Sequence, residues 1–484
     1  MFEQELLAER ARVTPDKLAL IDVESGARLT YAELNAGAER AAAMLRSRDV
    51  GAGDRFGILS YNSIEYLELF FAAGKIGAIV VPLSTRATLH ELTAIVEDSG
   101  MTWLYHGPEF AETAAALCRT GTLACPPSNY ERTGKSACPP WNDIYCLLYT
   151  SGTTGKPKGV MIPRRQLYWN GYNTAINWDL RADDISPIYT PLYHAGGLAA
   201  FTIPIFTAGG TMVLHKSFDV SQVWQTIVRE RCTVVLGVPT IWKMLMDAPE
   251  FATVKLDHVR WFISGGAPLP VYIAEAYTAR GVPMKQGYGM TEAGVNCFTM
   301  TVEESVTKRG SIGKPLLFTE VRIVDANGND VKNGEVGEMW IRGPHVAKGY
   351  WNNEAATREA FRDDGFLRTG DLARRDDDGF FFIAGRAKDM FISGGVNVYP
   401  AEIEAELVSH PRVADAAVVA VPDERWGEAG VAFVVAEATE EELSTYLSLR
   451  IAKFKLPRQF VFVDALPRTP YGKVEKAKLR ERLP

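Results

Sequence analysis

The chain has 484 residues, 47% of them apolar, and a formal net charge of −7 at pH 7. This length suffices for about three domains of ~150 residues, each with its own core. The acidic balance argues against a nucleic-acid or anionic-membrane partner. The N-terminus lacks a signal-peptide pattern, and Pro187, Pro191 and Pro204 interrupt the longest uncharged stretch, 185–215. We therefore expect a cytoplasmic protein without a membrane-spanning segment.

Six cysteines are present, and none forms a C-x-x-C pair: Cys118, Cys125, Cys138, Cys146, Cys232 and Cys297. Zinc sites and many redox sites place two cysteines at that spacing. We therefore expect reduced thiols rather than a disulfide or zinc framework.

Helix and strand patterns alternate through the first 300 residues. Apolar residues at three- and four-residue spacing predict helices at 29–45 and 65–76. Strands are predicted at 55–60 and 77–83, and the second lacks alternation, as expected when both faces are buried. Further apolar runs at 213, 234–235 and 262–263 complete a pattern typical of largely parallel sheets covered by helices.

The pattern changes after about residue 310. Short alternating strands predict a β-rich subdomain at about 310–384 (321–324, 338–341 and 380–383). Beyond it, helices at 400–409 and 440–453 and strands at 416–421 and 431–435 predict a compact α+β unit. The expected fold class is α/β and α+β multidomain: a large N-terminal domain of helix-covered mixed sheets (1–384), a linker (385–391) and a small C-terminal domain (392–484).

A segment rich in glycine and hydroxyl groups follows the apolar run 144–148. It reads YTSGTTGKPKGV, from Tyr149 to Val160. Glycines let backbone amides approach anionic oxygens, hydroxyl groups add donors and lysines add charge, so the loop suits a polyphosphate. The spacing of a Walker A loop is absent. The predicted phosphate-binding residues are Thr150, Ser151, Gly152, Thr153, Thr154, Gly155, Lys156 and Lys158.

This segment resembles the phosphate-binding signature of the adenylate-forming (ANL) superfamily, which includes acyl- and aryl-CoA synthetases, luciferases and peptide-synthetase adenylation domains. Six further segments resemble family motifs in the family's order: PLYHAGG (191–197), SGGAP (264–268), QGYGMTE (286–292), TGD (369–371), GRAKD (385–389) and PRTPYGKV (467–474). The resemblance covers nearly the whole chain and is to the AMP-forming acyl-CoA and aryl-CoA synthetases.

The resemblance implies a nucleotide site assembled from these motifs. The ring of Tyr288 would stack on adenine, with the backbone of 266–267 on the other side. Thr291 would bond to a phosphate, and Glu292 would offer a hard oxygen to Mg²⁺. Asp371 would accept both ribose hydroxyls, with Arg386 as an added donor. The rest of the implied nucleotide site is Gly266, Ala267, Pro268, Gln286, Gly287, Gly289, Met290 and Ile383.

The resemblance also assigns the catalytic groups, which are Lys473, His194, Thr154 and Glu292. Lys473 would bridge the substrate carboxylate and the ribosyl phosphate, where a fixed cation stabilises developing charge. His194 would lie against the carboxylate and the acyl chain.

In the family a mobile C-terminal domain rotates between two half-reactions, and the pivot matches Lys388. The second pose brings Gly394 and Gly395 to the pantetheine tunnel, and Trp426 and Phe454 would stack near the CoA nucleotide. Leu456 replaces an arginine that a related ligase has at that position, so Lys455 or Arg458 would have to contact the CoA phosphates.

By resemblance, the acyl pocket lies between the helix after His194 and the segments at 265 and 287–295. Gly196, Gly197, Gly287 and Gly289 are expected to leave space there. No charged residue falls within 194–200 or 287–290, so an apolar or aromatic acid fits better than an amino acid. The predicted lining is Tyr193, His194, Gly196, Gly197, Gly265, Gly287, Gly289 and Val295.

The predicted function is an AMP-forming acyl-CoA synthetase (an acid–thiol ligase) that uses ATP, CoA and Mg²⁺, with medium- and long-chain fatty acids slightly favoured. The alternatives are an aryl- or cinnamate-CoA ligase, acting on coumarate, ferulate or benzoate, and an enzyme that loads a carrier protein. A luciferase-like oxygenase and a non-catalytic nucleotide-binding scaffold are further readings; intact Lys473, Glu292 and Asp371 argue against the scaffold. The resemblance leaves a homodimer open.

Overall fold

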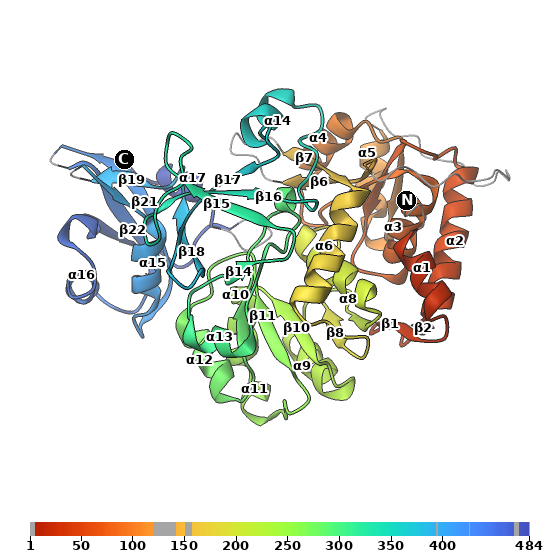
Figure 1. Ribbon diagram of the computed structural model, residues 1–484, viewed down its shortest axis with the longest axis horizontal. Coiled ribbons are helices and arrows are strands. Elements are labelled where there is room, and N and C mark those ends of the chain that lie inside the picture. Colours follow the sequence, from red (N-terminus) through yellow and green to blue (C-terminus); the bar gives the residue numbers. More distant parts are fainter. Residues whose placement is uncertain are drawn as a thin grey trace.

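The computed structural model describes residues 5–119, 142–150, 157–393, 395–424, 426–468 and 474–483. The elements from β19 onward lie at one end of the molecule and α1 to α5 lie at the other (Figure 1). The sheet β15–β18 lies between the C-terminal elements and the main body. This arrangement confirms the predicted fold class of mixed α/β and α+β units.

The sheet that carries the predicted phosphate loop has the order β5-β3-β4-β6-β7. Its first four strands are parallel, and β7 pairs antiparallel with β6, which places Thr150 opposite Lys158. The two ends of the loop therefore lie side by side. The strands are β3 (Arg55–Leu59), β4 (Ile79–Pro82), β5 (Trp103–His106), β6 (Ile144–Thr150) and β7 (Lys158–Pro163).

The predicted helix at 29–45 forms as α2 (Tyr31–Ser47). Thr30 and Glu33 make a reciprocal capping box at its start, which satisfies backbone donors that a helix end otherwise leaves unpaired. The predicted helix at 65–76 forms as α3 (Ile64–Ile76) and ends at Gly77, whose φ of 74° suits a glycine. The other helices of this half are α1 (Leu6–Val13), α4 (Leu89–Ser99), α5 (Ala111–Cys118) and α6 (Arg164–Asn177).

Two further sheets complete the main body, with orders β2-β1-β9-β8 and β10-β11-β12. The strands are β1 (Leu18–Asp22), β2 (Arg28–Thr30), β8 (Ile185–Ile188), β9 (Thr211–Leu214), β10 (Val234–Gly237), β11 (Trp261–Ser264) and β12 (Met284–Gln286). The last three are parallel. The helices are α7 (Ala195–Gly197), η2 (Leu198–Thr202), α8 (Ile203–Ala208), α9 (Val220–Arg229), α10 (Pro239–Asp247), α11 (Glu250–Thr253), α12 (Val271–Ala279) and α13 (Val302–Thr307).

The predicted β-rich segment forms an antiparallel sheet of β15 (Glu320–Val324), β16 (Gly337–Arg342), β17 (Leu367–Arg375) and β18 (Phe381–Arg386). The C-terminal unit has the strand order β20-β19-β22-β21, with β23 beside β22. Its strands are β19 (Phe391–Ser393), β20 (Val396–Val398), β21 (Val413–Asp423), β22 (Gly427–Ala436) and β23 (Gln459–Phe462). The helices are α14 (Glu354–Ala360), α15 (Pro400–Val408), α16 (Glu440–Ser448) and α17 (Lys476–Arg480).

One sequence-based helix boundary is wrong, and the predicted linker overlaps two strands. The helix predicted at 440–453 ends at Ser448, and a separate 3-10 turn follows at Lys453–Lys455. The predicted linker 385–391 is strand at both ends, because β18 pairs Arg386 with Asp371 and β19 begins at Phe391. Only 387–390 connect the two sheets.

Cys146, Cys232 and Cys297 are free and buried. Cys118 is disulfide-bonded, so the expectation of six reduced thiols is wrong at this position. Within the described ranges, each helix is too short or too polar to cross a membrane.

Candidate active site

The carboxylate of Asp371, in β17, forms one corner of the site. Oδ1 accepts from Nε of Arg386 at 2.9 Å, and Oδ2 accepts from the hydroxyl of Tyr288 at 2.6 Å. The register of β17 and β18 places Asp371 opposite Arg386, so the sheet itself fixes this pair. A carboxylate has about four acceptor positions. Both oxygens thus keep capacity for the ribose hydroxyls that the resemblance assigns to Asp371.

Tyr288 connects this corner to the predicted adenine segment. Its ring packs edge-on against Phe298, with centroids 5.6 Å apart. Burial and the Asp371 carboxylate raise the pKa of Tyr288 well above its usual range, so the phenol stays a donor. A Cβ on Gly265 would meet no atom within 4 Å, and 266–268 are exposed. The surface beside the predicted adenine site is therefore open, and the stacking role stays a prediction.

Glu292 forms a second corner, in the 3-10 turn η3 (Thr291–Ala293), and is 6% exposed. The hydroxyl of Tyr350 donates to its Oε1 at 2.9 Å. Nζ of Lys158 lies over the face of the same tyrosine ring, 5.1 Å from the centroid. Burial and the Glu292 charge raise the pKa of Tyr350, so the phenol is the donor. Tyr350 therefore contacts two predicted site residues, although the motifs do not indicate it.

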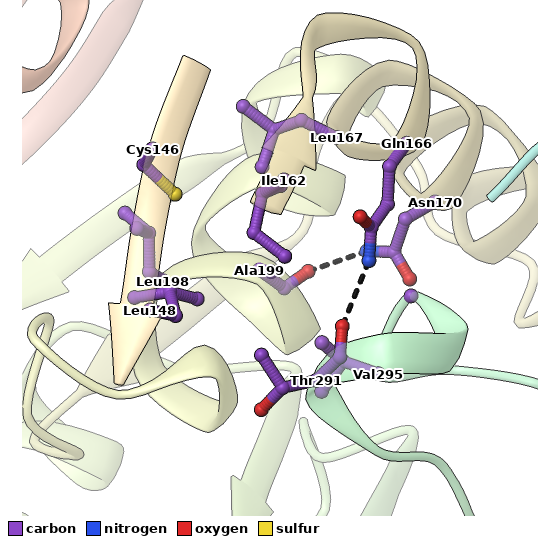
Figure 2. Close-up of a pocket in the computed structure, with 11 residues that line it drawn as sticks. Cys146, Leu148, Ile162, Gln166, Leu167, Asn170, Leu198, Ala199, Thr291 and Val295 are labelled. Carbon is purple, nitrogen blue, oxygen red and sulfur yellow. Dashed lines mark hydrogen bonds between the residues drawn. The ribbon is translucent and has the colours of Figure 1, made fainter. Parts of the chain in front are cut away.

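Three consecutive carbonyl groups of the motif loop 291–293 are held by separate donors. Nε2 of Gln166, in α6, donates to the carbonyl of Thr291 at 2.8 Å (Figure 2). The backbone amide of Ala347 donates to the carbonyl of Glu292 at 2.8 Å. Nδ1 of His345 lies 2.6 Å from the carbonyl oxygen of Ala293. Preorganised donors of this kind keep a polar loop in one conformation before a ligand arrives.

His345 is fully buried, and its contacts assign its tautomer. A carbonyl oxygen only accepts, so Nδ1 carries the proton that bonds to Ala293. Nε2 then accepts from the hydroxyl of Thr319 at 2.7 Å. Burial lowers the pKa of His345 to about 4, so the ring is neutral at pH 7.

Both strands that carry the predicted phosphate loop are anchored. The hydroxyl of Tyr149 donates to Oδ2 of Asp98 at 2.6 Å, and Nε1 of Trp351 donates to the carbonyl of Asp98 at 3.1 Å. The amide of Trp351 also donates to the carbonyl of Gly159 at 2.8 Å. The segment 350–351 thus fastens the outgoing strand, and Asp98 fastens the incoming one.

His194 caps the short helix α7. Its Nδ1 accepts from the amide of Gly196 at 3.0 Å, so Nε2 carries the proton of the neutral ring. Oδ1 of the buried Asn62 accepts from the amide of Leu192 at 2.8 Å, which fixes the turn before His194. The contact between His194 and a substrate carboxylate stays a prediction.

Two of the four glycines predicted to leave space do not. A Cβ on Gly197 would lie 2.3 Å from the carbonyl oxygen of Pro191, and one on Gly289 would lie 1.7 Å from that of Val295. Both glycines permit close approach of the chain to itself, so the expectation of free space is wrong at these positions. A Cβ on Gly287 would make only ordinary van der Waals contacts, at 3.4 Å with Ile263 and at 3.6 Å with Trp178.

A small apolar pocket lies between the helix after His194 and the motif loop (Figure 2). The sequence does not reveal its far wall, made by β6, β7 and α6. Asn170 of α6 donates to the carbonyl of Ala199 at 2.6 Å and accepts from the amide of Asn296 at 3.2 Å. Oε1 of Gln166 has no hydrogen-bond partner in the described part of the chain. The lining is Cys146, Leu148, Ile162, Gln166, Leu167, Asn170, Leu198, Ala199, Thr291, Gly294 and Val295.

Aromatic rings close the space behind Gly287. A Cβ on that glycine would lie 3.6 Å from the ring of Trp178. Trp178, Phe201 and Trp261 pack against one another with centroids 6.2–6.4 Å apart, and each is at most 3% exposed. The indole of Trp178 donates to the carbonyl of Phe298 at 3.1 Å, which fixes the ring.

The predicted CoA-binding residues lie in the C-terminal unit. Phe454 packs partly buried against its core, and the amide of Trp426 donates to Asp423 at 2.9 Å. Lys455 pairs with Glu402 at 2.7 Å, and Arg458 pairs with Asp423 at 3.3 Å. Both proposed substitutes for the missing arginine thus have acidic partners here.

The hinge position Lys388 is exposed, and so is Gly395, whose φ is +82°. Eight predicted site residues lie outside the described residues: Ser151, Gly152, Thr153, Thr154, Gly155, Lys156, Gly394 and Lys473.

Glu292 is suited to Mg²⁺ when the nucleotide supplies the other ligands. The described residues contain no group of three or more His, Cys, Asp or Glu side chains that would form a site by themselves. Magnesium is usually held by one or two carboxylates together with substrate phosphates. A single nearly buried carboxylate beside a phosphate loop fits that mode.

Comparisons with known proteins agree with this geometry. The family model described as AMP-binding enzyme matches residues 7–351, and the model described as AMP-binding enzyme C-terminal domain matches 402–473. A feruloyl-CoA synthase of an Amycolatopsis species is 41% identical over 480 residues, which cover 98% of this chain and 97% of that protein. The long-chain-fatty-acid–CoA ligase FadD13 of Mycobacterium tuberculosis is 37% identical over 498 residues, with 99% and 97% covered.

Solved structures give the same relationship. The o-succinylbenzoate CoA synthetase MenE from Bacillus subtilis, in complex with its acyl-adenylate intermediate, superposes with a TM-score of 0.90 at 34% identity, covering 99% of this chain and 98% of that one. MatB from Rhodopseudomonas palustris with bound ATP also superposes with a TM-score of 0.90, at 33% identity and 99% coverage of both chains. The chain therefore belongs to the AMP-binding enzyme family, in the acyl- and aryl-CoA synthetase branch of the adenylate-forming superfamily.

Proposed function

We propose that this CoA ligase acts on an aromatic carboxylic acid, activating it as the acyl-adenylate and transferring the acyl group to CoA. The chain is an acid–thiol ligase that uses ATP, CoA and Mg²⁺. The proposal concerns only the class of acid, which we propose to be aromatic.

The aromatic wall behind Gly287 carries this proposal. By resemblance the acid lies beside Gly287, where a Cβ would lie 3.6 Å from Trp178, and Phe201 and Trp261 pack against that ring. A long acyl chain that entered there would need an open path past these fixed rings. A short, flat acid requires less depth, and aromatic rings pack favourably edge-on against one another. The names feruloyl-CoA synthase and o-succinylbenzoate CoA synthetase, given to two of the similar proteins, also denote enzymes of aromatic acids.

In the first half-reaction a carboxylate oxygen of the acid attacks the α-phosphorus of ATP. A carbon–oxygen–phosphorus anhydride forms, and the bond to pyrophosphate breaks. Asp371 and Tyr288 would hold the nucleoside, and Nε2–H of His194 would orient the acid. Glu292 would hold Mg²⁺, which supplies charge neutralisation between the anions. Lys473, by resemblance, would stabilise the charge that develops on the α-phosphate.

In the second half-reaction the CoA thiol attacks the carbonyl carbon of the anhydride. A carbon–sulfur bond forms, the carbon–oxygen bond to AMP breaks, and the thiol proton passes to solvent. The same resemblance places a rotation about Lys388 between the two steps, which would bring 393–395 to the pantetheine.

A pyrophosphate-release screen tests the proposal. Ferulate, coumarate, cinnamate and benzoate are compared with saturated acids from C2 to C18, with and without CoA. We expect kcat/KM to be highest for an aromatic acid and pyrophosphate release to persist without CoA. A clear preference for C12 to C18 acids would contradict the aromatic assignment.

A long-chain fatty acid is the second candidate, favoured by the 37% identity to a long-chain-fatty-acid–CoA ligase. The same screen separates the two acids. Product analysis with CoA and with an acyl-carrier protein separates a CoA ligase from a carrier-loading enzyme.

A further inference from the structure

Tyr350 contacts two residues that are predicted to act on the metal and on the phosphates, Glu292 and Lys158. Its hydroxyl bonds to Oε1 of Glu292 at 2.9 Å, and its ring face lies under the ammonium group of Lys158. We infer that Tyr350 is a positioning residue of the cation site: it holds one oxygen of Glu292 and leaves Oε2 as the oxygen available to the divalent ion.

The tyrosine is rigid enough for this role. Its amide donates to the hydroxyl of Thr357 at 2.9 Å, and its backbone bridges to Val160 of β7. Its ring packs edge-on against Phe361, with centroids 5.7 Å apart. The backbone and ring of Tyr350 are thus fixed independently of Glu292. The hydroxyl therefore has a fixed position, and the Glu292 carboxylate must orient toward it to form the hydrogen bond.

Neither water nor a backbone shift can readily replace the Tyr350 hydroxyl as the donor to the Glu292 carboxylate. Glu292 is 6% exposed, so water cannot replace a lost donor at low cost. The carbonyl of Glu292 is held by Ala347, so the backbone does not move to compensate. Loss of the phenolic donor would free the side chain to rotate without unfolding the loop. The expected consequence is weaker binding of the cation rather than loss of the fold.

Through Lys158, Tyr350 would also influence the binding of the nucleotide phosphates. An ammonium group over an aromatic face is attracted to it, which restricts where the charge lies. Tyr350 thereby sets the positions of a carboxylate for the metal and a cation for the phosphates with one side chain. The inference rests on the adenylating part of the proposed function, since it presupposes a metal–nucleotide complex.

Binding of Mn²⁺ is the direct test, because Mn²⁺ replaces Mg²⁺ and free Mn²⁺ is quantified by electron paramagnetic resonance. The full chain is titrated with MnCl₂ in the presence of α,β-methylene-ATP, which cannot transfer its adenylate group because the methylene bridge is not cleaved. We expect Tyr350→Phe to weaken Mn²⁺ binding about tenfold, the effect of removing a hydrogen bond to a charged group. The variant keeps the ring, so its contacts with Phe361 and Lys158 remain.

Tyr31→Phe is the matched control, because it also removes a buried tyrosine hydrogen bond, at 2.6 Å to the carbonyl of Gly210. It should leave Mn²⁺ binding unchanged. Glu292→Gln should weaken binding, and the double variant with Tyr350→Phe should be no weaker than Glu292→Gln alone, since Tyr350 acts through that carboxylate. Circular dichroism and thermal melting establish that all variants fold.

Wild-type affinity in Tyr350→Phe, or a double variant whose loss is the product of the two single losses, would overturn the inference. The titration contains neither acid nor CoA. If no aromatic acid releases pyrophosphate but Tyr350→Phe still weakens Mn²⁺ binding, only the proposed substrate fails. If an aromatic acid is activated and Tyr350→Phe binds Mn²⁺ normally, only the role of Tyr350 fails.

Discussion

Replacement of His345 by Asn should make the stability of the protein less sensitive to acid. Burial lowers the pKa of this histidine to about 4, Arg165 adds to the lowering, and the bond to Ala293 opposes it. In the unfolded chain the value returns to about 6.5. Between these values the unfolded state binds a proton that the folded state does not, so stability falls as pH falls through this window.

The magnitude follows from the two pKa values. The full difference corresponds to roughly 3 kcal/mol, and about 2 kcal/mol of it is lost between pH 7 and pH 5. Burial also lowers the pKa of His215 to about 4, which adds a contribution of the same sign. Asn retains an amide donor for the carbonyl of Ala293 and removes the titration. His345→Asn should therefore remove about half of the acid sensitivity that these two histidines cause.

Urea unfolding followed by tryptophan fluorescence measures this, with the midpoint determined at intervals from pH 7 to pH 5. His90→Asn is the control, because His90 is exposed at the start of α4. It should leave the pH dependence unchanged. A His345→Asn protein whose midpoint falls with pH as steeply as that of the wild type would refute the reasoning, because His345 would then not be the neutral buried group.

Three further predictions concern the reaction cycle and the fold. Lys473→Ala should lose adenylation ~100-fold or more, measured by pyrophosphate release, yet still form thioester from supplied acyl-AMP; equal loss of both steps would contradict this. Lys388→Pro should show the reverse, because a fixed φ at the pivot blocks rotation. Gly289→Ala should lower the melting temperature strongly, since its Cβ would lie 1.7 Å from the carbonyl oxygen of Val295. Gly265→Ala, with no atom within 4 Å, should melt like the wild type.

The sequence predicts which motifs share a site better than it predicts what each residue contacts. Motif order places Tyr288 and Asp371 together, and the structure joins them by a hydrogen bond across 83 positions of sequence. The sequence does not show that the tyrosine hydroxyl bonds to the carboxylate of Asp371, the predicted ribose-binding residue. That contact depends on how the segment between β12 and η3 packs against β17.

Two kinds of feature are invisible in the sequence. Tyr350 belongs to no motif with a recognised chemistry, and it reaches Glu292 only because its segment pairs with β7. Glycine is ambiguous by itself: it marks either room for a ligand or close approach of two backbones. Gly197 and Gly289 are of the second kind, and only coordinates distinguish the two.

The amide side chains of α6 have a consequence for redesign of the enzyme. Gln166 bonds to a carbonyl group of η3 and Asn170 to a carbonyl group of η2. A shift of α6 by one residue would turn the helix by about 100°. The two buried amides would then lose their hydrogen-bond partners, each at a cost of about 1–3 kcal/mol. The helix is thereby locked in one rotational setting. Leu167 and Leu198, on facing walls of the pocket, can therefore be exchanged for larger or smaller side chains against a backbone that stays in register.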